Sequence, residues 1–119
     1  MKAKSWKTTI TKQCKAVGTM NAAFVSVIDT LADILEQRDA AYTQFVREGS
    51  KIIIERTSDR GAVNSAKNPL WVAWNDLNSQ ALTYWRDLGL TPKGLKAISD
   101  SIQKEEANPL DQMLKEFGR

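Results

Sequence analysis

Residues 68–92 read NPLWVAWNDLNSQALTYWRDLGLTP, and this stretch decides the fold. Asn68 can cap a helix, and Pro69 suits the first helical position because an N–H there would have no partner. Apolar residues then recur at alternating spacings of four and three, which is a heptad pattern. They are Leu70, Trp74, Leu77, Ala81, Tyr84 and Leu88. Gly89 suits the left-handed conformation that ends many helices. The stretch therefore predicts one helix of about five turns, and nothing on it looks catalytic.

Aromatic residues widen the apolar face of this helix. Trp71 and Trp85 flank the heptad stripe on its two sides. One interpretation is a helix with a broad face toward its own core. The other is a face that also serves a second subunit, since large exposed apolar patches usually mark interfaces. We expect the oligomer interface to include Phe24, Trp71, Trp74 and Trp85.

A second long helix is predicted over residues 21–48. Thr19 or Asn21 can cap it, and a glycine follows its last turn. Its apolar positions are Phe24, Ile28, Leu31, Leu35, Tyr42 and Phe45. Arg38 takes one position of this seam, so it either extends to solvent or forms an ion pair. Asp39 follows it in sequence and is expected on another face of the helix.

Residues 50–67 read SKIIIERTSDRGAVNSAK and break the helical rhythm. Three consecutive isoleucines favour extended structure, and residues 59–61 supply turn chemistry. We therefore predict a mainly α fold in which a short β-hairpin joins two long antiparallel helices. Because an isolated hairpin is marginal in water, it should pack on a helix or add to a neighbouring subunit. Its basic residues are a second candidate set for DNA phosphates: Lys51, Arg56, Arg60 and Lys67.

The first 18 residues form a short basic helix or arm. Residues 1–28 hold five of the 17 basic residues and none of the 14 acidic ones. Such a segment indicates an anionic partner, most often nucleic acid, or a solubilising tail. Trp6, Ile10, Cys14 and Val17 would line one face, and Trp6 either anchors the arm or stacks on a base. We expect the fold to tolerate deletion of residues 1–15. The candidate DNA-binding residues are Lys2, Lys4, Trp6, Lys7, Lys12 and Lys15.

A short amphipathic tail closes the chain. Thr91 can cap a further helix, and Pro109 interrupts the chain after it because the proline ring blocks helix continuation. Residues 108–119 then place Leu110, Met113, Leu114 and Phe117 at helical spacing. This tail either docks a partner protein or forms a frayed terminal helix. The chain thus divides into a basic arm at 1–18, a helical oligomerisation body at 19–107 and a tail at 108–119.

The composition argues against an enzyme. The chain has one cysteine, Cys14, and no histidine. These counts exclude an internal disulfide, a Cys/His zinc site and a nucleophile activated by histidine. There is no Walker-type phosphate loop, and we expect no metal and no cofactor. No apolar run reaches the roughly 18 residues of a membrane-spanning helix, and no secretory signal follows the basic start. We therefore expect a cytoplasmic protein.

In their order and spacing, these segments resemble the small subunit of tailed-bacteriophage terminases. The resemblance extends from Trp6 to the tripeptide at 109–111. It rests on the helix end at 42–49, the glycine-containing hairpin, the Asn-Pro helix start and the LGLTP turn at 88–92. The family often continues with small residues and an arginine, where this chain has Lys93-Gly94-Leu95-Lys96. A role of that arginine cannot be carried over directly and would fall to Lys93 or Lys96.

The resemblance implies a non-enzymatic DNA-packaging factor in the host bacterial cytoplasm. Small terminase subunits of this kind look like ring-shaped homo-oligomers that recognise the viral packaging site. They recruit or regulate the large subunit, which carries the ATPase and the nuclease. The implied partners are viral double-stranded DNA, the large subunit and further copies of the chain. Two alternatives are a small helical transcriptional regulator that binds DNA as a dimer, and a structural head-connector protein of a phage.

Overall fold

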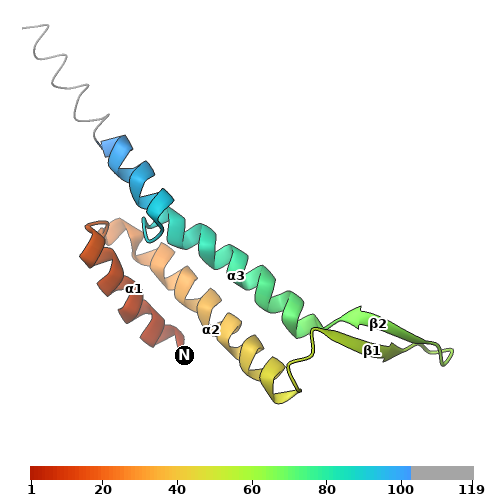
Figure 1. Cartoon of the computed structure of the whole chain (residues 1–119). Helices are drawn as coiled ribbons and strands as arrows, with labels where there is room; N and C mark the ends of the chain where they lie inside the picture. The colour runs from red at the N-terminus through yellow and green to blue at the C-terminus, as the bar shows by residue number, and fades with distance from the viewer. Residues whose placement is uncertain (103–119) are drawn as a thin grey trace, which may run out of the picture.

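Helices packed side by side form the body of the molecule (Figure 1). A computed structural model describes residues 1–102. The elements are α1 (Ala3–Val17), the 3-10 turn η1 (Ala22–Phe24), α2 (Val25–Arg47), β1 (Ile53–Thr57), β2 (Val63–Lys67) and α3 (Pro69–Asp87). Residues 92–102 are also helical. The predicted mainly α class with a two-stranded antiparallel sheet is confirmed, and the ring stays a prediction.

The start of the second helix follows the predicted capping chemistry. The side chain of Asn21 accepts a hydrogen bond from the backbone N–H of Ala23 at 2.8 Å. Asn21 is therefore the cap, and the alternative, Thr19, has another role. The Thr19 hydroxyl donates to the carbonyl oxygen of Leu88 at 2.7 Å. This bond ties the segment between α1 and α2 to the end of α3.

Asn68 joins the hairpin to α3. Its Oδ1 accepts from the backbone N–H of Leu70 at 3.0 Å and caps the helix. Its Nδ2 donates to the carbonyl oxygen of Lys51 at 2.9 Å. Its backbone N–H donates to the carbonyl oxygen of Ile52 at 2.7 Å. Asn68 is buried, so its polar atoms need these partners. One residue thus fixes both the helix start and the base of the hairpin.

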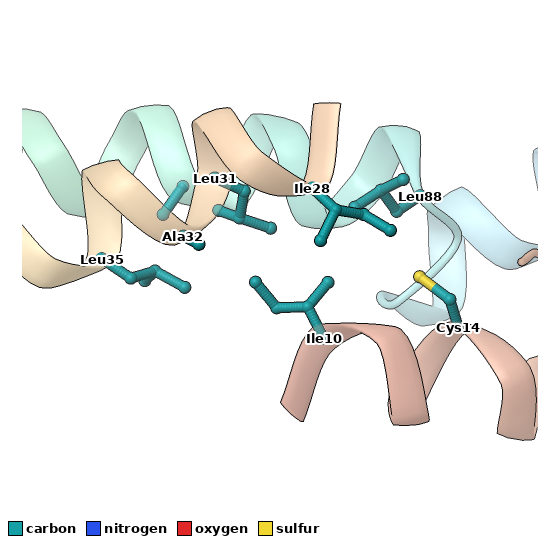
Figure 2. Close-up of a cluster of buried hydrophobic side chains, with 8 residues drawn as sticks. Ile10, Cys14, Ile28, Leu31, Ala32, Leu35 and Leu88 are labelled. Carbon is teal, nitrogen blue, oxygen red and sulfur yellow. The ribbon is translucent and has the colours of Figure 1, made fainter. Parts of the chain in front are cut away.

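The main core is a cluster of buried side chains between the helices (Figure 2), at the end of the body away from the hairpin in Figure 1. It consists of Ile10 and Cys14 of α1, Ile28, Leu31, Ala32 and Leu35 of α2, Ala81 of α3, and Leu88 just beyond α3. Full burial of a large aliphatic side chain contributes about 1.5–3 kcal/mol. Because Ile10 and Cys14 are completely buried, α1 is part of the core. The expectation that the fold tolerates deletion of residues 1–15 is therefore wrong.

The heptad stripe of α3 faces the rest of the protein, as predicted. None of its six positions is exposed, and Ala81 and Leu88 are almost completely buried. The predicted apolar faces of α1 and α2 are less completely buried. Val17 at the end of α1 is 39% exposed, and Tyr42 on α2 is 51% exposed. Val17 lies at the end of α1, where the neighbouring helices give less cover.

The hairpin extends away from the helical body (Figure 1). Its antiparallel register pairs Ile53 with Lys67 and Thr57 with Val63. Gly61 adopts a φ of +82° in the turn, which favours glycine. Ile53 and Val63 are 56% and 60% exposed. Within residues 1–102, therefore, the strands do not pack on a helix, and addition to a neighbouring subunit stays a prediction.

Candidate nucleic-acid and protein-binding surfaces

Three lysines of α1 point away from the core. The helix turns by about 100° per residue, so Lys4, Lys12 and Lys15 fall within about 80° of one another. The buried positions Ile10 and Cys14 lie on the other side of the helix. All three lysines are exposed, and no ion pair holds any of them among the described residues. They form one basic stripe on a helix whose opposite face is anchored in the core.

The other two N-terminal lysines, Lys2 just before α1 and Lys7 on α1, pair with acidic residues of α2. Lys7 Nζ lies 2.8 Å from Asp29 Oδ1, and Lys2 Nζ lies 3.8 Å from Glu36 Oε1. The side chains are between 37% and 89% exposed, so each pair contributes at most about 1 kcal/mol. These acidic residues of α2 therefore face α1, and they compete with any phosphate for the two lysines.

Trp6 belongs to a polar cluster between the helices. Its Nε1 donates to Asp39 Oδ2 at 2.7 Å. The Arg38 guanidinium donates to Asn78 Oδ1 at 2.9 Å and to Asp39 Oδ1 at 3.2 Å. Its Cζ also lies 5.7 Å from the ring centroids of both Trp6 and Trp85. The placement of Asp39 away from Arg38 was wrong, because the long arginine side chain reaches back to its neighbour's carboxylate.

The cluster sets the charge state of Asp39. Partial burial alone would raise the pKa of this carboxyl. Hydrogen bonds from Trp6 Nε1, the Met1 ammonium and Arg38 outweigh that effect, and the pKa lies below its ordinary value. The carboxylate is therefore held in its charged form, where it can accept bonds from all three donors. This arrangement clamps α1 to α2 at the Met1 end of α1.

The basic residues of the hairpin do not form one face. Residues that alternate along a strand point to opposite sides of the sheet. Arg56 pairs with Asn64, whereas Lys67 pairs with Ile53 in the other set of positions. Lys51 lies before β1, and Arg60 lies in the turn. The structure thus spreads this second candidate set over both faces and both ends of the hairpin.

The four predicted interface residues separate into different places. The rings of Trp71 and Trp74 stack with centroids 5.7 Å apart, near Phe45 and close to the hairpin. Trp85 lies about 16 Å further along the helix at 1.5 Å per residue, where it packs against the core. Phe24 is 38% exposed in η1. Only the first two rings form one aromatic surface, together with exposed Tyr42, whose centroid is 6.5 Å from that of Trp74.

An open apolar groove lies at the other end of the body. Its volume is about 710 Å³. It is lined by the end of α1, the last turns of α3 and the start of the helix at 92–102, with Val17, Leu82, Trp85, Leu90, Pro92 and Leu95 as its main apolar residues. The sequence patterns did not predict this groove. The one local signal for it was Leu82, an apolar residue outside the heptad stripe and one helical turn before Trp85.

The candidate docking residues Leu110, Met113, Leu114 and Phe117 lie outside the described residues. Lys93 and Lys96, the candidates for the role of the family's arginine, are both exposed on the helix at 92–102. In the described part of the chain there is no cluster of residues suited to a metal ion. No helix of residues 1–102 is long and apolar enough to cross a membrane.

A comparison with protein families matches the description "Phage terminase, small subunit" over residues 3–105. The match spans most of the chain. This chain belongs to the phage terminase small subunit family. Comparisons with curated proteins and with solved structures found no match. Membership in the terminase family confirms the resemblance at the level of the family and assigns the chain a general role in phage DNA packaging. The small subunit of a terminase is generally the non-catalytic, regulatory subunit.

Proposed function

We propose that this terminase small subunit binds viral double-stranded DNA at the packaging site and brings the large ATPase-nuclease subunit to it. The observation that carries the proposal is the basic stripe of Lys4, Lys12 and Lys15 on a helix anchored in the core. A firmly held helix presents its charges at fixed positions, and lysine is a common phosphate contact. The family role suggests viral DNA and the large subunit as partners, and the basic stripe is a suitable surface for the DNA.

The basic stripe is a better DNA surface than the hairpin. Its three lysines share one side of one helix, whereas the four basic residues of the hairpin are divided between two faces. A duplex presents a regular array of phosphates, so basic residues on one face can contact it together. Lys2 and Lys7 contribute less, because each would first have to leave an ion pair with α2.

We further propose that the protein works as a homo-oligomer larger than a dimer. Copies of the chain would cover the exposed hairpin and the surface formed by Tyr42, Trp71 and Trp74. Unpaired strand edges and exposed apolar side chains are common sites of association. A ring would also repeat the basic stripe once per subunit, which multiplies the phosphate contacts. The residues at 108–119 are then proposed to dock the large subunit.

The test is a change of charge without a change of fold. The variant Lys4→Gln/Lys12→Gln/Lys15→Gln should keep the wild-type circular dichroism and melting temperature, because all three side chains are exposed. Its affinity for packaging-site DNA should fall at least tenfold at low salt. The log–log salt slope should also drop by about 0.9 for each phosphate that the variant no longer neutralises. Both quantities can be measured by fluorescence anisotropy over a salt series.

The matched control removes the charges of the hairpin. The variant Lys51→Gln/Arg56→Gln/Arg60→Gln/Lys67→Gln deletes four charges, one more than the first variant. It should weaken DNA binding less than the α1 variant does. Wild-type affinity and salt slope in the α1 variant, with weaker binding in the hairpin variant, would contradict the proposed surface and assign DNA binding to the hairpin.

A further inference from the structure

We propose that the groove formed by Leu82, Leu95 and their neighbours is the docking site for residues 108–119 of this same chain when no large subunit is bound. The floor of the groove is continuous with the core, since Trp85 and Leu90 also pack against the core residues. Leu82 is 49% exposed and Val17 is 39% exposed at its sides. An open apolar site of this size is suited to one face of an amphipathic helix.

The length of chain outside the described residues fits this occupant. Residues 92–102 form a helix about 16 Å long at 1.5 Å per residue, and its first turn lines the groove. Residues 103–107 can span at most about 17–18 Å. The segment at 108–119 can therefore return along this helix to the groove at its start.

The apolar residues of the segment match the surface of the groove. In a helical conformation, Leu110, Met113, Leu114 and Phe117 would share one face. The groove offers aliphatic and aromatic side chains from three elements, and polar lining residues are few. Docking would bury both apolar surfaces at once, and burial of apolar area is favourable.

Charge favours the same pairing. Residues 108–119 contain two acidic and two basic residues, and the linker before them carries Glu105 and Glu106. The segments that line the groove are bordered by basic residues instead: Lys12 and Lys15 on α1, and Lys93 and Lys96 on the helix at 92–102. No acidic residue occurs in residues 1–28 or 88–99. The acidic linker residues that lead into the segment therefore approach a groove with a basic border, where opposite charges favour association.

Occupation of the groove would regulate the proposed docking of the large subunit. The inference rests on the proposed function only for this consequence. One apolar face cannot be buried in the groove and against a partner at the same time. The large subunit would have to displace the segment, and the net affinity would be lower by the free energy of groove docking.

The sole cysteine permits a clean cross-linking test in the full-length protein. Cys14 is completely buried, so engineered surface cysteines supply the accessible thiols. We would combine Leu82→Cys with a cysteine substitution at Leu110, Met113, Leu114 or Phe117 in turn. The matched control replaces Leu82→Cys by Thr83→Cys, which lies one residue away on an exposed face outside the groove. Disulfide formation requires Cα atoms about 4.4–6.8 Å apart.

At least one of the four pairs with Leu82→Cys should cross-link about tenfold faster than its Thr83→Cys control, because docking raises the local concentration of the thiol. Mass spectrometry of the non-reduced protein identifies the linked residues, within one chain or between two. Equal rates for all four pairs and their controls would overturn the proposal. A disulfide between two Leu82→Cys side chains alone would also overturn it, since the groove would then face a second groove.

A second measurement separates this inference from the proposed function. The cross-linked protein should bind the large subunit more weakly than the same protein after reduction. A cross-link that forms without any effect on large-subunit binding supports the groove assignment and contradicts the proposed docking role of residues 108–119. DNA binding by the basic stripe does not enter either measurement.

Discussion

The helical body and the hairpin of this protein are held in different ways. In the body, side chains from α1, α2 and α3 enclose one another, and eight of them are almost completely buried. In the hairpin, the strands pair with each other and leave two apolar residues of one face, Ile53 and Val63, more than half exposed. The contrast indicates that the body is stable within one chain, whereas the hairpin would gain burial only in the proposed oligomer.

A core substitution should have the largest effect on the body. Leu31 is completely buried among residues of α1 and α2. Leu31→Ala should lower the free energy of unfolding by about 2–5 kcal/mol, because it leaves a cavity that the neighbours fill only in part. Urea denaturation followed by circular dichroism measures this. Leu31→Met preserves volume and should cost less than about 1.5 kcal/mol; equal losses for the two variants would contradict the cavity explanation.

A variant of the hairpin should change the association of the protein and leave the stability of the helices unchanged. Ile53→Lys/Val63→Lys should leave the stability of the helices in the dissociated chain within about 0.5 kcal/mol of wild type. The mass measured by light scattering at micromolar concentration should nevertheless fall, because the added charges oppose burial against another copy. A wild-type mass for this variant would remove the hairpin from the interface, and a monomer mass for the wild-type protein would remove the oligomer itself.

Substitution of two glycines, one in the body and one in the hairpin, should have effects of intermediate size on stability. A Cβ at Gly94 would collide with the backbone carbonyl of Arg86 at the end of α3, whereas a Cβ at Gly61 would meet nothing within 4 Å. Gly94→Ala should therefore destabilise the packing of the helix at 92–102 by about 1–3 kcal/mol. Gly61→Ala introduces only the strain of its φ of +82°, about 1–2 kcal/mol, and this cost stays in the hairpin. Thermal melting of the helical signal should shift for Gly94→Ala and stay constant for Gly61→Ala.

The last of these effects concerns the clamp between α1 and α2, and it depends on pH. The pKa of Asp39 is lowered in the folded protein. Its stabilisation is therefore present above the unfolded value of about 3.9 and is lost as the pH falls through the lower folded value. Asp39→Asn should cost about 1–2 kcal/mol at pH 7 and progressively less below pH 4. Urea denaturation between pH 2 and 7 measures this, and a cost independent of pH would contradict the role of the charge.

Much of the fold could be predicted because its signals are local. Asn68 and Pro69 start α3, Gly89 ends it, and the heptad spacing identifies the side that packs inward. The hairpin could be predicted from its isoleucines and turn residues. In each case the responsible atoms lie within a few residues of one another, so the chemistry of a short segment is sufficient.

The candidate surfaces were less predictable from the sequence, because they depend on neighbours that are distant along the chain. Five lysines look equivalent in the sequence of residues 1–18. Only the approach of α2 distinguishes Lys2 and Lys7, which are paired, from Lys4, Lys12 and Lys15. From the sequence alone, Gly94 is a residue of low helix propensity. Only the tertiary structure shows that it lies against the backbone of Arg86.

The sequence by itself determined the helices, the hairpin, their limits and the family, since those depend on local propensity, spacing and order. The tertiary structure alone decided that α1 is part of the core, that Asp39 holds Trp6 and Arg38 together, and that an apolar groove opens beside Leu82. Side chains more than 60 residues apart line that groove. Their proximity is a result of packing three helices against one another, and the periodicity of any single helix does not contain it.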